Sequence, residues 1–403
     1  MSAALKPGSM IGDHQLVKKL GEGAIGTVFE AVHGLIGKRV AIKVLKRSGE
    51  EGQVAAKRLL EEARAVNAIQ HRGIIDIFDA GLLTDGRPYL VMELLVGRSV
   101  HDELKRAKGG LPMRLVLHIL TGMLDALAAA HRAGVIHRDL KASNVFLVDQ
   151  PAGLPLVKLV DFGVARRQTR EEVLTMPSMT VGSLGFMAPE HLAGQPVVQS
   201  DLYSVGCLAW LMLAGRPVFP YGNQGVLVQQ HLHEKAPPVR GARKDVTAEL
   251  DAWVSWLLEK RVEERPHSAE VARDVLHEAE LALEGLRTVP GGPSFIELAK
   301  DYDRRARAES NQKLQPVTDL NPVFVPPPEP EPPKKAQRGT PAPRPAPPLE
   351  AGSQRTPRVL TASRRTELAE TGDDDTLRPP KPTKGPFDSD ISTVVDTRSR
   401  RGR

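Results

Sequence analysis

The sequence predicts an α+β fold of two lobes, a small β-rich lobe followed by a larger helical lobe. The first hundred residues alternate apolar and polar positions as strands do, with one helical stretch at residues 54–69. Beyond them the apolar residues recur with helical spacing, and Gly134 and Gly215 are placed to end two helices. After about Ala308 the composition changes sharply, which predicts the end of the folded region.

The last part of the chain is too poor in apolar residues to build a core. Residues 311–403 hold 18 prolines and only 15 Leu, Ile, Val or Phe in 93 positions. These strong apolar residues make up about 16% of the segment, below the ~20% that a packed core needs. We therefore expect a disordered, Pro-rich tail. The expected regions are an N-terminal extension at 1–10, a folded domain at 11–286 with lobes at 11–95 and 96–286, a helical or linker segment at 287–310, and the tail at 311–403.

The tail also carries most of the net charge. It holds 16 Lys and Arg against 12 Asp and Glu, so +4 of the chain's +6 lies there. A charge this modest and this dispersed does not favour nucleic acid as a partner. Residues 371–376 and 391–397 are short enough to be recognition motifs. The tail is therefore either a solvated disordered segment or a binding site for partner proteins that recognise phosphothreonine or proline motifs.

Cysteine content and hydropathy favour a soluble, cytoplasmic protein. Cys207, the only cysteine, lies in an apolar run, so we expect a buried small hydrophobe and no disulfide or cysteine metal site. The first ten residues do not form a secretory signal. The longest apolar stretches, within residues 115–130 and 205–214, fall short of the ~20 residues that a membrane span needs. We therefore expect no membrane span.

Residues 137–145, His-Arg-Asp-Leu-Lys-Ala-Ser-Asn-Val, place a carboxylate, an ammonium and an amide on one short loop. Asp139 is a candidate base for a hydroxyl proton, and Lys141 can hold a phosphate oxygen. Asn144 can ligate a hard cation. A hydroxyl nucleophile, a phosphate and Mg²⁺ together indicate phosphoryl transfer.

A glycine-rich loop follows residues 16–20 and carries Gly21, Gly23 and Gly26. Backbone N–H groups can approach phosphates there because no Cβ atoms obstruct them. The same spacing occurs in dinucleotide-binding turns. Here, however, Val28 and its neighbours continue as a strand and no helix begins at Gly26, which argues against that alternative.

Lys43 lies in the middle of an apolar strand at residues 39–45. An unpaired buried charge is costly, so this lysine needs a partner unless it reaches solvent from an edge strand. On the helical stretch that follows, Glu62 falls on the apolar stripe and Glu61 on the polar side. We therefore expect a Lys43–Glu62 ion pair, with Glu61 solvated.

A second candidate metal ligand follows residues 157–160, which are expected to form a strand. Asp161 stands there with Phe162 and Gly163 after it, 17 residues beyond Asn144. A carboxylate just past the end of a strand suits a metal ligand, and with Asn144 it can hold Mg²⁺ between phosphates.

The next motif, Met-Ala-Pro-Glu, ends at Glu190. It follows a stretch that is otherwise typical of an ordinary exposed loop but is rich in hydroxyls, namely Thr175, Ser178, Thr180 and Ser183. Asp201 then stands near the start of a helix that is apolar on all sides and is therefore expected to be buried. Arg265 precedes a proline farther on.

These motifs, in this order, resemble those of the eukaryotic-type (Hanks-type) serine/threonine protein kinases of bacteria, over about residues 14–281. The resemblance implies the bilobed protein kinase fold, ATP with Mg²⁺ or alternatively Mn²⁺, and proteins with Ser or Thr hydroxyls as substrates. Asp139 would accept the hydroxyl proton and Lys141 would stabilise the transferring phosphoryl group, while Asn144 and Asp161 would hold the metal. The implied ATP-binding residues are Gly21, Glu22, Gly23, Ala24, Gly26, Val28, Ala41, Lys43, Glu62, Met92, Glu93 and Leu95.

Three of these ATP contacts would be made to the adenine. Met92 would lie behind the base, and the backbone of Glu93 and Leu95 would hydrogen-bond its edge. Lys43, held by Glu62, would face the α- and β-phosphates.

The resemblance also implies structural and regulatory roles. Arg138 would belong to a basic pocket that phosphate on the activation loop neutralises, with Thr175, Ser178 and Thr180 as candidate phosphosites. Asp201 would brace the catalytic loop, and Ser183 would contact Asp139 and Lys141. Arg265 would pair with Glu190. The structural positions are Arg138, Phe162, Gly163, Ser183, Glu190, Asp201 and Arg265.

The sequence departs from the family pattern without losing a catalytic group. Ala142 stands where proline is common, Arg72 and Gly73 replace Pro-Asn, and Ser183 stands where threonine is usual. Two alternatives remain. The intact catalytic residues argue against a pseudokinase scaffold, and the Ala-Pro-Glu segment with its hydroxyl-rich loop argues against a small-molecule phosphotransferase.

Overall fold

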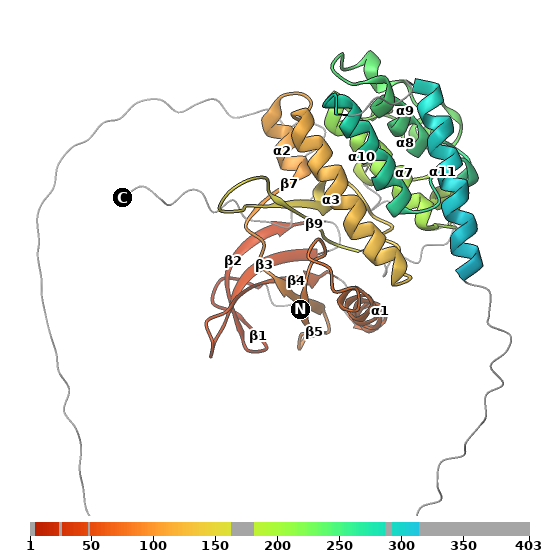
Figure 1. Cartoon of the computed structure of the whole chain (residues 1–403). Helices are drawn as coiled ribbons and strands as arrows, with labels where there is room; N and C mark the ends of the chain where they lie inside the picture. The colour runs from red at the N-terminus through yellow and green to blue at the C-terminus, as the bar shows by residue number, and fades with distance from the viewer. Residues whose placement is uncertain (1–4, 24–25, 47–48, 163–180, 287–291, 314–403) are drawn as a thin grey trace, which may run out of the picture. The chain divides into compact units, whose positions relative to one another are not determined.

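The computed structural model describes residues 5–23, 26–46, 49–162, 181–286 and 292–313. These residues belong to one of the two compact units into which the chain divides. The strands gather in the first part of the chain and most of the helices in the second (Figure 1). The two-lobed α+β fold expected from the sequence is confirmed.

The first lobe is built on a six-stranded antiparallel sheet. Its strands are β1 (Met10–Ile11), β2 (His14–Glu22), β3 (Gly26–His33), β4 (Arg39–Leu45), β5 (Ile77–Leu82) and β6 (Pro88–Glu93). They lie in the order β1-β2-β3-β4-β6-β5. Along β4, Val40, Ile42 and Val44 enter one apolar cluster and Ala41 enters another. The two faces of the strand therefore pack differently, as the period of two predicts.

Helix α1 (Gly49–Asn67) packs against β5 and β6. It begins earlier than the stretch expected from the sequence and ends before Ile69. Leu59 and Val66 are buried in the same core cluster as residues of β5 and β6, whereas Glu61 is exposed. The expected amphipathic pattern is confirmed at these positions.

The second lobe begins with a three-stranded sheet, β7 (Gly97–Ser99), β8 (Val145–Val148) and β9 (Leu156–Leu159). The short 3₁₀ helix η1 (Ala142–Asn144) leads into β8. Strand β9 is also joined to the loop after α1. The N–H of Leu159 donates to the carbonyl of Gly73 at 2.8 Å, and the N–H of Ile75 donates to that of Leu159 at 3.1 Å.

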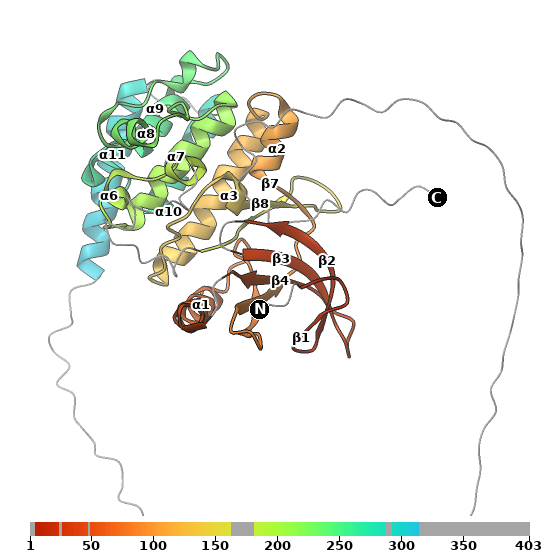
Figure 2. The same cartoon turned by 180° about the vertical axis from the view of Figure 1, so that it is seen from behind.

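Helices α3 (Met113–Arg132) and α7 (Val198–Ala214) pack together in the helical lobe (Figure 2). Helix α7 is buried from Ser200 to Leu213, as its all-round apolar sequence predicts. Gly134 and Gly215, with φ of 73° and 70°, follow the ends of the two helices, so both predicted stops are confirmed. The other helices of this lobe are α2 (Val100–Ala107), α5 (Val181–Leu184), α6 (Pro189–Leu192), α8 (Gln224–His233), η3 (Val239–Gly241), α9 (Ala248–Leu257), η4 (Val262–Glu264) and α10 (Ala269–Leu283).

By length and composition, α3 is apolar enough to cross a membrane. The expectation that its apolar stretch is too short is therefore wrong. Ten of its residues, among them Ile119, Leu120 and Met123, are buried against other parts of the protein. Core helices of globular proteins share these properties, so they do not assign α3 to a membrane.

Cys207 lies within α7 and is 1% exposed. Burial raises the pKa of its thiol to about 12, so the thiol is protonated at neutral pH. The expected buried, unreactive cysteine is confirmed.

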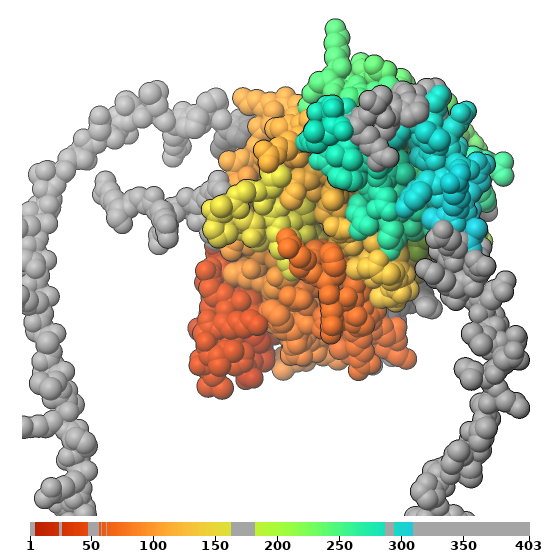
Figure 3. All heavy atoms as spheres, in the orientation of Figure 1, coloured from red at the N-terminus to blue at the C-terminus, as the bar shows by residue number. Residues whose placement is uncertain are grey.

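Helix α11 (Gly292–Lys313) follows α10 and packs on α9 and α10. Phe295 and Ala299 on its inner face belong to the main core cluster. The helix lies against α10 on the surface shown in Figure 3. This part of the segment expected to be a helix or a linker is therefore helical and contributes to the core.

Candidate active site

The catalytic loop at residues 137–144 is held by one buried carboxylate. Asp201, which is 1% exposed, accepts hydrogen bonds from the N–H of His137 at 2.8 Å and from that of Arg138 at 3.0 Å. Its Oδ2 is also 2.8 Å from Nε2 of His131. Burial alone would raise the pKa of Asp201, but these partners hold that pKa below its ordinary value. The charged carboxylate therefore fixes the loop backbone to α7.

Two residues of the site have left-handed backbones although neither is glycine. Arg138 has a φ of 63° and Asp161 a φ of 57°. Such conformations cost about 1–3 kcal/mol each and persist only where the surroundings hold them. The bond from Arg138 to Asp201 does so for the loop, and the N–H of Val160, which donates to the carbonyl of Asn144 at 3.0 Å, does so beside Asp161.

Asp139, Lys141 and Asn144 converge on one another. Nδ2 of Asn144 donates to the carbonyl of Asp139 at 2.8 Å and to its Oδ2 at 3.2 Å. Nζ of Lys141 lies 3.7 Å from the same Oδ2 and donates to Oγ of Ser183 at 3.1 Å. A carboxylate, an ammonium and an amide thus meet at one place, which is the set that transfer of a phosphoryl group to a hydroxyl requires.

His137 joins the catalytic loop to the segment of Asp161, a role that the sequence did not predict. Its buried ring donates Nε2–H to the carbonyl of Val160 at 3.1 Å and packs on Phe162, with the ring centroids 4.4 Å apart. Burial lowers the pKa of His137, so the ring is neutral. Its place two residues before Asp139 was the one available signal.

Lys43 pairs with Asp161, with Nζ 2.7 Å from Oδ1. Strand β4 lies between β3 and β6, so the alternative of an edge-strand lysine that reaches solvent is wrong. The side chain of Glu62 lies outside the described residues, and the Lys43–Glu62 pair stays a prediction.

At the base of the glycine-rich loop the N–H of Gly23 donates to the carbonyl of Gly26 at 2.9 Å. Ala24 lies outside the described residues. A Cβ at Gly26 would come within 2.4 Å of the carbonyl oxygen of Val44. Gly26 is therefore required by the close approach of β3 to β4, which is a different reason from access to phosphates. Gly21 and Gly23 remain predicted phosphate positions.

Glu22 directs its carboxylate to two lysines of the same lobe. It pairs with Lys46 at 2.9 Å and with Lys19. The hydrogen bonds from Lys19 and Lys46 lower the pKa of Glu22 to about 2. Any contact of Glu22 with ATP is therefore expected from its backbone.

Four of the residues predicted to bind ATP lie in one apolar cluster, namely Val28, Ala41, Met92 and Leu95. The cluster also contains Ile75, Phe146 and Val160. Apolar contacts from both lobes suit a planar base, so the cluster fits the adenine of ATP. Ile75, Phe146 and Val160 were not singled out from the sequence, although Phe146 stands in the apolar run after Asn144.

Both the side chain and the backbone N–H of Glu93 are bonded to other residues of the protein. Its carboxylate pairs with Lys158 and accepts the N–H of Asp76 at 2.8 Å. Its N–H donates to the carbonyl of Asp76 at 3.0 Å. The carbonyl of Glu93 is therefore the group expected to meet the edge of the base.

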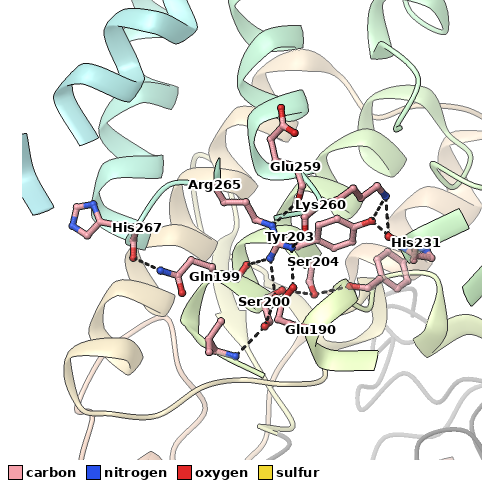
Figure 4. A network of polar contacts seen from close by, with 12 residues as sticks. Glu190, Gln199, Ser200, Tyr203, Ser204, His231, Glu259, Lys260, Arg265 and His267 are labelled. Atoms are coloured by element: carbon pink, nitrogen blue, oxygen red, sulfur yellow. Dashed lines mark hydrogen bonds and ion pairs between the residues drawn. The ribbon is translucent and has the colours of Figure 1, made fainter. Parts of the chain in front are cut away.

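The Glu190–Arg265 pair expected from the sequence is present, with a buried arginine and a mostly buried carboxylate. Nη1 and Nη2 of Arg265 each donate to one carboxylate oxygen at 2.8 Å, and the arginine side chain is 0% exposed. Ser200 donates its hydroxyl to the same carboxylate. Burial alone would raise the pKa of Glu190, but the bonds from Arg265 and Ser200 hold it below its ordinary value. Arg265 also donates to the carbonyls of Gln199, Glu259 and Lys260, at 3.0, 2.7 and 3.1 Å (Figure 4).

The predicted basic pocket can be followed only at Arg138. Its Nε is buried and has no hydrogen-bond partner among the residues that the structure describes. The candidate phosphosites Thr175, Ser178 and Thr180, and also Gly163, lie outside those residues. The pocket and its phosphate stay predictions.

A divalent metal ion fits the donors offered by Asn144 and Asp161. The bond between Val160 and Asn144 brings Asp161, the next residue, beside the catalytic loop. Carboxylate and amide oxygens are the hard donors that Mg²⁺ prefers. Asp161 already attracts a cation, because the ammonium of Lys43 lies against its carboxylate.

Comparison with known sequences identifies the family to which this chain belongs. The family profile described as the protein kinase domain matches residues 14–277. This chain belongs to the protein kinase family. The kinase fold is confirmed by the crystal structure of the Mycobacterium tuberculosis PknI kinase domain, which aligns with a TM-score of 0.54 at 26% identity and covers 68% of this chain and 100% of that one.

Bacterial serine/threonine-protein kinases are among the curated relatives of this kinase, as expected from the sequence. The serine/threonine-protein kinase Pkn1 of Myxococcus xanthus is 36% identical over 300 residues, which cover 72% of this chain and 42% of Pkn1. The probable serine/threonine-protein kinase pknA2 of Bifidobacterium longum is 34% identical over 286 residues, which cover 69% of this chain and 37% of pknA2. The chain thus spans less than half the length of either relative.

Proposed function

We propose that this chain is a serine/threonine protein kinase that transfers the γ-phosphate of Mg-ATP to Ser or Thr hydroxyls of proteins. The observation that carries this proposal is the meeting of Asp139, Lys141 and Asn144, with Ser183 bonded to Lys141. Pkn1 and pknA2 are named serine/threonine-protein kinases, which supports the same activity.

In the proposed mechanism the protein positions reactants and stabilises charge. Asp139 orients the substrate hydroxyl and accepts its proton, while Asn144 holds the Asp139 side chain in place. Lys141 faces the transferring phosphoryl group. Asp161 and Asn144 would hold the metal ion, which when bound neutralises phosphate charge. Lys43 is partly exposed, so its ammonium can move from Asp161 to the α- and β-phosphates.

The direct test is Asp139→Asn in the full chain, with Asp149→Asn as the matched control. Asp149 lies at the surface just after β8. Asp139→Asn should leave ATP affinity unchanged and lower the single-turnover rate ~10²–10⁴-fold, because it removes the proton acceptor. The control should transfer phosphate at the wild-type rate. An unchanged rate in Asp139→Asn would contradict the assignment.

The choice of acceptor separates the proposal from its alternatives. Wild-type protein should phosphorylate a generic basic protein on Ser or Thr in the presence of labelled ATP. Transfer to choline or an aminoglycoside alone would favour a small-molecule phosphotransferase. ATP binding without any transfer would favour a pseudokinase.

From the composition of the chain we also propose a cytoplasmic location, and partners of the tail that recognise phosphothreonine or proline motifs.

The proposal extends to regulation by autophosphorylation. Arg138 contributes a buried guanidinium nitrogen without a partner among the described residues, and a phosphate adds about −1.5 to −2 charge that pairs with arginine. Phosphate on Thr175 or Thr180 should therefore raise the rate. Mass spectrometry of protein made with and without a phosphatase, with rates for the Thr175→Ala/Thr180→Ala double variant, checks this. Full activity of the phosphatase-treated protein and of the double variant would contradict it.

A further inference from the structure

Helix α11 lies beyond the residues that match the kinase-domain profile, which ends at residue 277. It is nevertheless part of the packed lobe. Phe295 and Ala299 are each 5% exposed in the main core cluster, and Tyr302 donates its hydroxyl to Asp274 of α10 at 3.0 Å. The helix therefore has a fixed place on the kinase domain, although the family pattern does not include it.

One carboxylate of α11 reaches the loop that contains Arg265. Asp303 is 5% exposed and its Oδ1 accepts two bonds from His267, one from the backbone N–H at 2.8 Å and one from ring Nδ1 at 2.7 Å. Arg307, one turn along the helix, pairs with the same carboxylate at 3.3 Å. A buried carboxylate is costly unless it is paired and hydrogen-bonded, so these contacts specify where Asp303 must lie.

The bonds continue from His267 to the Glu190–Arg265 pair. The carbonyl of His267 accepts a bond from the side-chain amide of Gln199 at 3.2 Å, and the carbonyl of Gln199 accepts a bond from Arg265 at 3.0 Å. Figure 4 shows this succession from His267 through Gln199 to Arg265 and Glu190. Asp303 is thus connected by hydrogen bonds to α6, the helix that directly follows the Ser183 segment.

We propose that Asp303 is a positioning residue for residues 181–192, the segment that carries Ser183 at Lys141 and Glu190 at Arg265. Asp303 fixes His267, and the carbonyl of His267 fixes the side chain of Gln199. Arg265, which is bonded to Gln199, then holds Glu190, so that the segment keeps the orientation in which Ser183 meets Lys141. This inference rests on the proposed kinase function for its kinetic consequence. Its structural consequence can be measured separately.

The test compares full-length Asp303→Ala and Asp303→Asn with the control Asp301→Asn. Asp301 lies on the same helix but is more exposed, and among the described residues its ion pairs are with Arg304 and Arg305 of α11 itself. Amide hydrogen exchange should become about tenfold faster at residues 186–192 in Asp303→Ala, corresponding to ~1.4 kcal/mol of lost protection. Asp303→Asn keeps an oxygen that can accept the bond from the His267 N–H, so this variant should retain part of the protection from exchange that Asp303→Ala loses. Exchange across residues 204–213 of α7, away from Gln199, should match the wild type in all variants.

The kinetic readout is a split between substrates. Asp303→Ala should raise the KM for a protein substrate about tenfold and leave the KM for ATP unchanged, because the ATP contacts lie elsewhere. If Asp303→Ala does not fold, Gln199→Ala breaks the same connection without touching α11 and should give the same changes at residues 186–192.

Two results would overturn the inference. One is faster exchange confined to residues 265–268 and α11, with residues 186–192 as in the wild type, since Asp303 would then be a local contact. The other is an equal rise in the KM for both substrates. If the wild type transfers no phosphate to any protein, the proposed function fails, and the exchange data still decide whether Asp303 positions the segment.

Discussion

The Glu190–Arg265 pair and the Lys43–Asp161 pair differ in burial and in the number of partners. The Arg265 side chain is 0% exposed and donates to both oxygens of Glu190 and to three backbone carbonyls. Lys43 and Asp161 are 18% and 26% exposed, and among the described residues Asp161 is the ion-pair partner of Lys43. The first pair has no donor left for a new ligand, whereas the second can exchange its partner.

The difference shows how one fold separates fixed charges from reactive ones. A fully bonded, buried arginine cannot leave without depriving a mostly buried carboxylate of its partner, which is strongly unfavourable. A partly exposed lysine with a single ion-pair partner among the described residues loses less when it moves, because water can reach both charges. We therefore expect substitutions in the first pair to change stability most and substitutions in the second to change activity most.

Arg265→Ala should have the largest effect on stability. It leaves the Glu190 carboxylate buried without its partner, and the free energy of unfolding should fall by about 3–5 kcal/mol. Urea denaturation measures this. The control is Arg261→Ala, since Arg261 is 76% exposed and pairs with Glu263 at 3.7 Å, a surface pair worth ~0–1 kcal/mol. Equal losses in the two variants would show that the burial of Arg265 does not matter.

Lys43→Met should reverse this pattern. We expect the free energy of unfolding to change by less than ~1 kcal/mol and the rate of phosphate transfer to fall ~10²–10³-fold, as for other lost groups that stabilise developing charge. Urea denaturation and single-turnover kinetics check the two parts. Lys46→Met, at an exposed lysine that pairs with Glu22, should change neither. A large loss of stability in Lys43→Met would mean that the pair is structural.

Glu62→Gln sharpens the comparison by asking whether Lys43 has a second partner. If Glu62 positions Lys43 when ATP binds, the transfer rate should fall about tenfold, or ~1.4 kcal/mol in the barrier. Glu61→Gln is the matched control because Glu61 is exposed on the same helix. Equal losses, or a larger one for Glu61, would show that the predicted helix register is wrong.

The smallest expected effect concerns the buried groups beside Arg265. His231 is 1% exposed, its Nδ1 is 3.0 Å from the hydroxyl of Tyr203, and Arg265 stacks over the Tyr203 ring (Figure 4). Burial, followed by the charge of Lys260, lowers the pKa of His231 to about 3. In the unfolded chain the pKa of His231 is near 6.5, so between about pH 6.5 and about pH 3 His231 binds a proton in the unfolded chain but stays neutral in the folded one. The free energy of unfolding should therefore fall as pH drops from about 6.5 toward about 3.

His231→Asn removes this titration and can still bond to Tyr203. The slope of the free energy of unfolding between pH 6.5 and 5.5 should be shallower than in the wild type, by at most ~1.4 kcal/mol per pH unit. His277→Gln, at an exposed histidine of α10, should keep the wild-type slope. An unchanged slope in His231→Asn would show that His231 titrates normally in the folded protein.

Local patterns in the sequence predicted much of the fold. Strand β4 was predicted from alternation alone, and the ends of α3 and α7 from two glycines, because these signals act within a few residues. The catalytic loop was predicted for the same reason, since Asp139 and Asn144 lie on one turn. The steric requirement for glycine at position 26 was not predicted, because it depends on the carbonyl of Val44 in the neighbouring strand.

The roles that the sequence missed all depend on contacts between distant segments. His137 bonds to Val160, and the Lys158 ammonium pairs with Glu93. Asp303 meets His267 from a helix beyond the family pattern. For none of these residues does the spacing of a motif indicate which residue it contacts. Hydropathy and periodicity therefore could not predict these contacts.

The sequence by itself determined the chemistry available to this protein, namely the carboxylates, the ammonium groups and the glycines of the kinase motifs and their order along the chain. Only the tertiary structure decided which of them meet. Lys43 and Asp161 are 118 positions apart and lie 2.7 Å from each other, and Asp201 holds a loop 64 positions away. The physical reason is that spacing along the chain constrains neighbours within a turn or a hairpin, whereas contacts between lobes and helices follow from how the whole core packs.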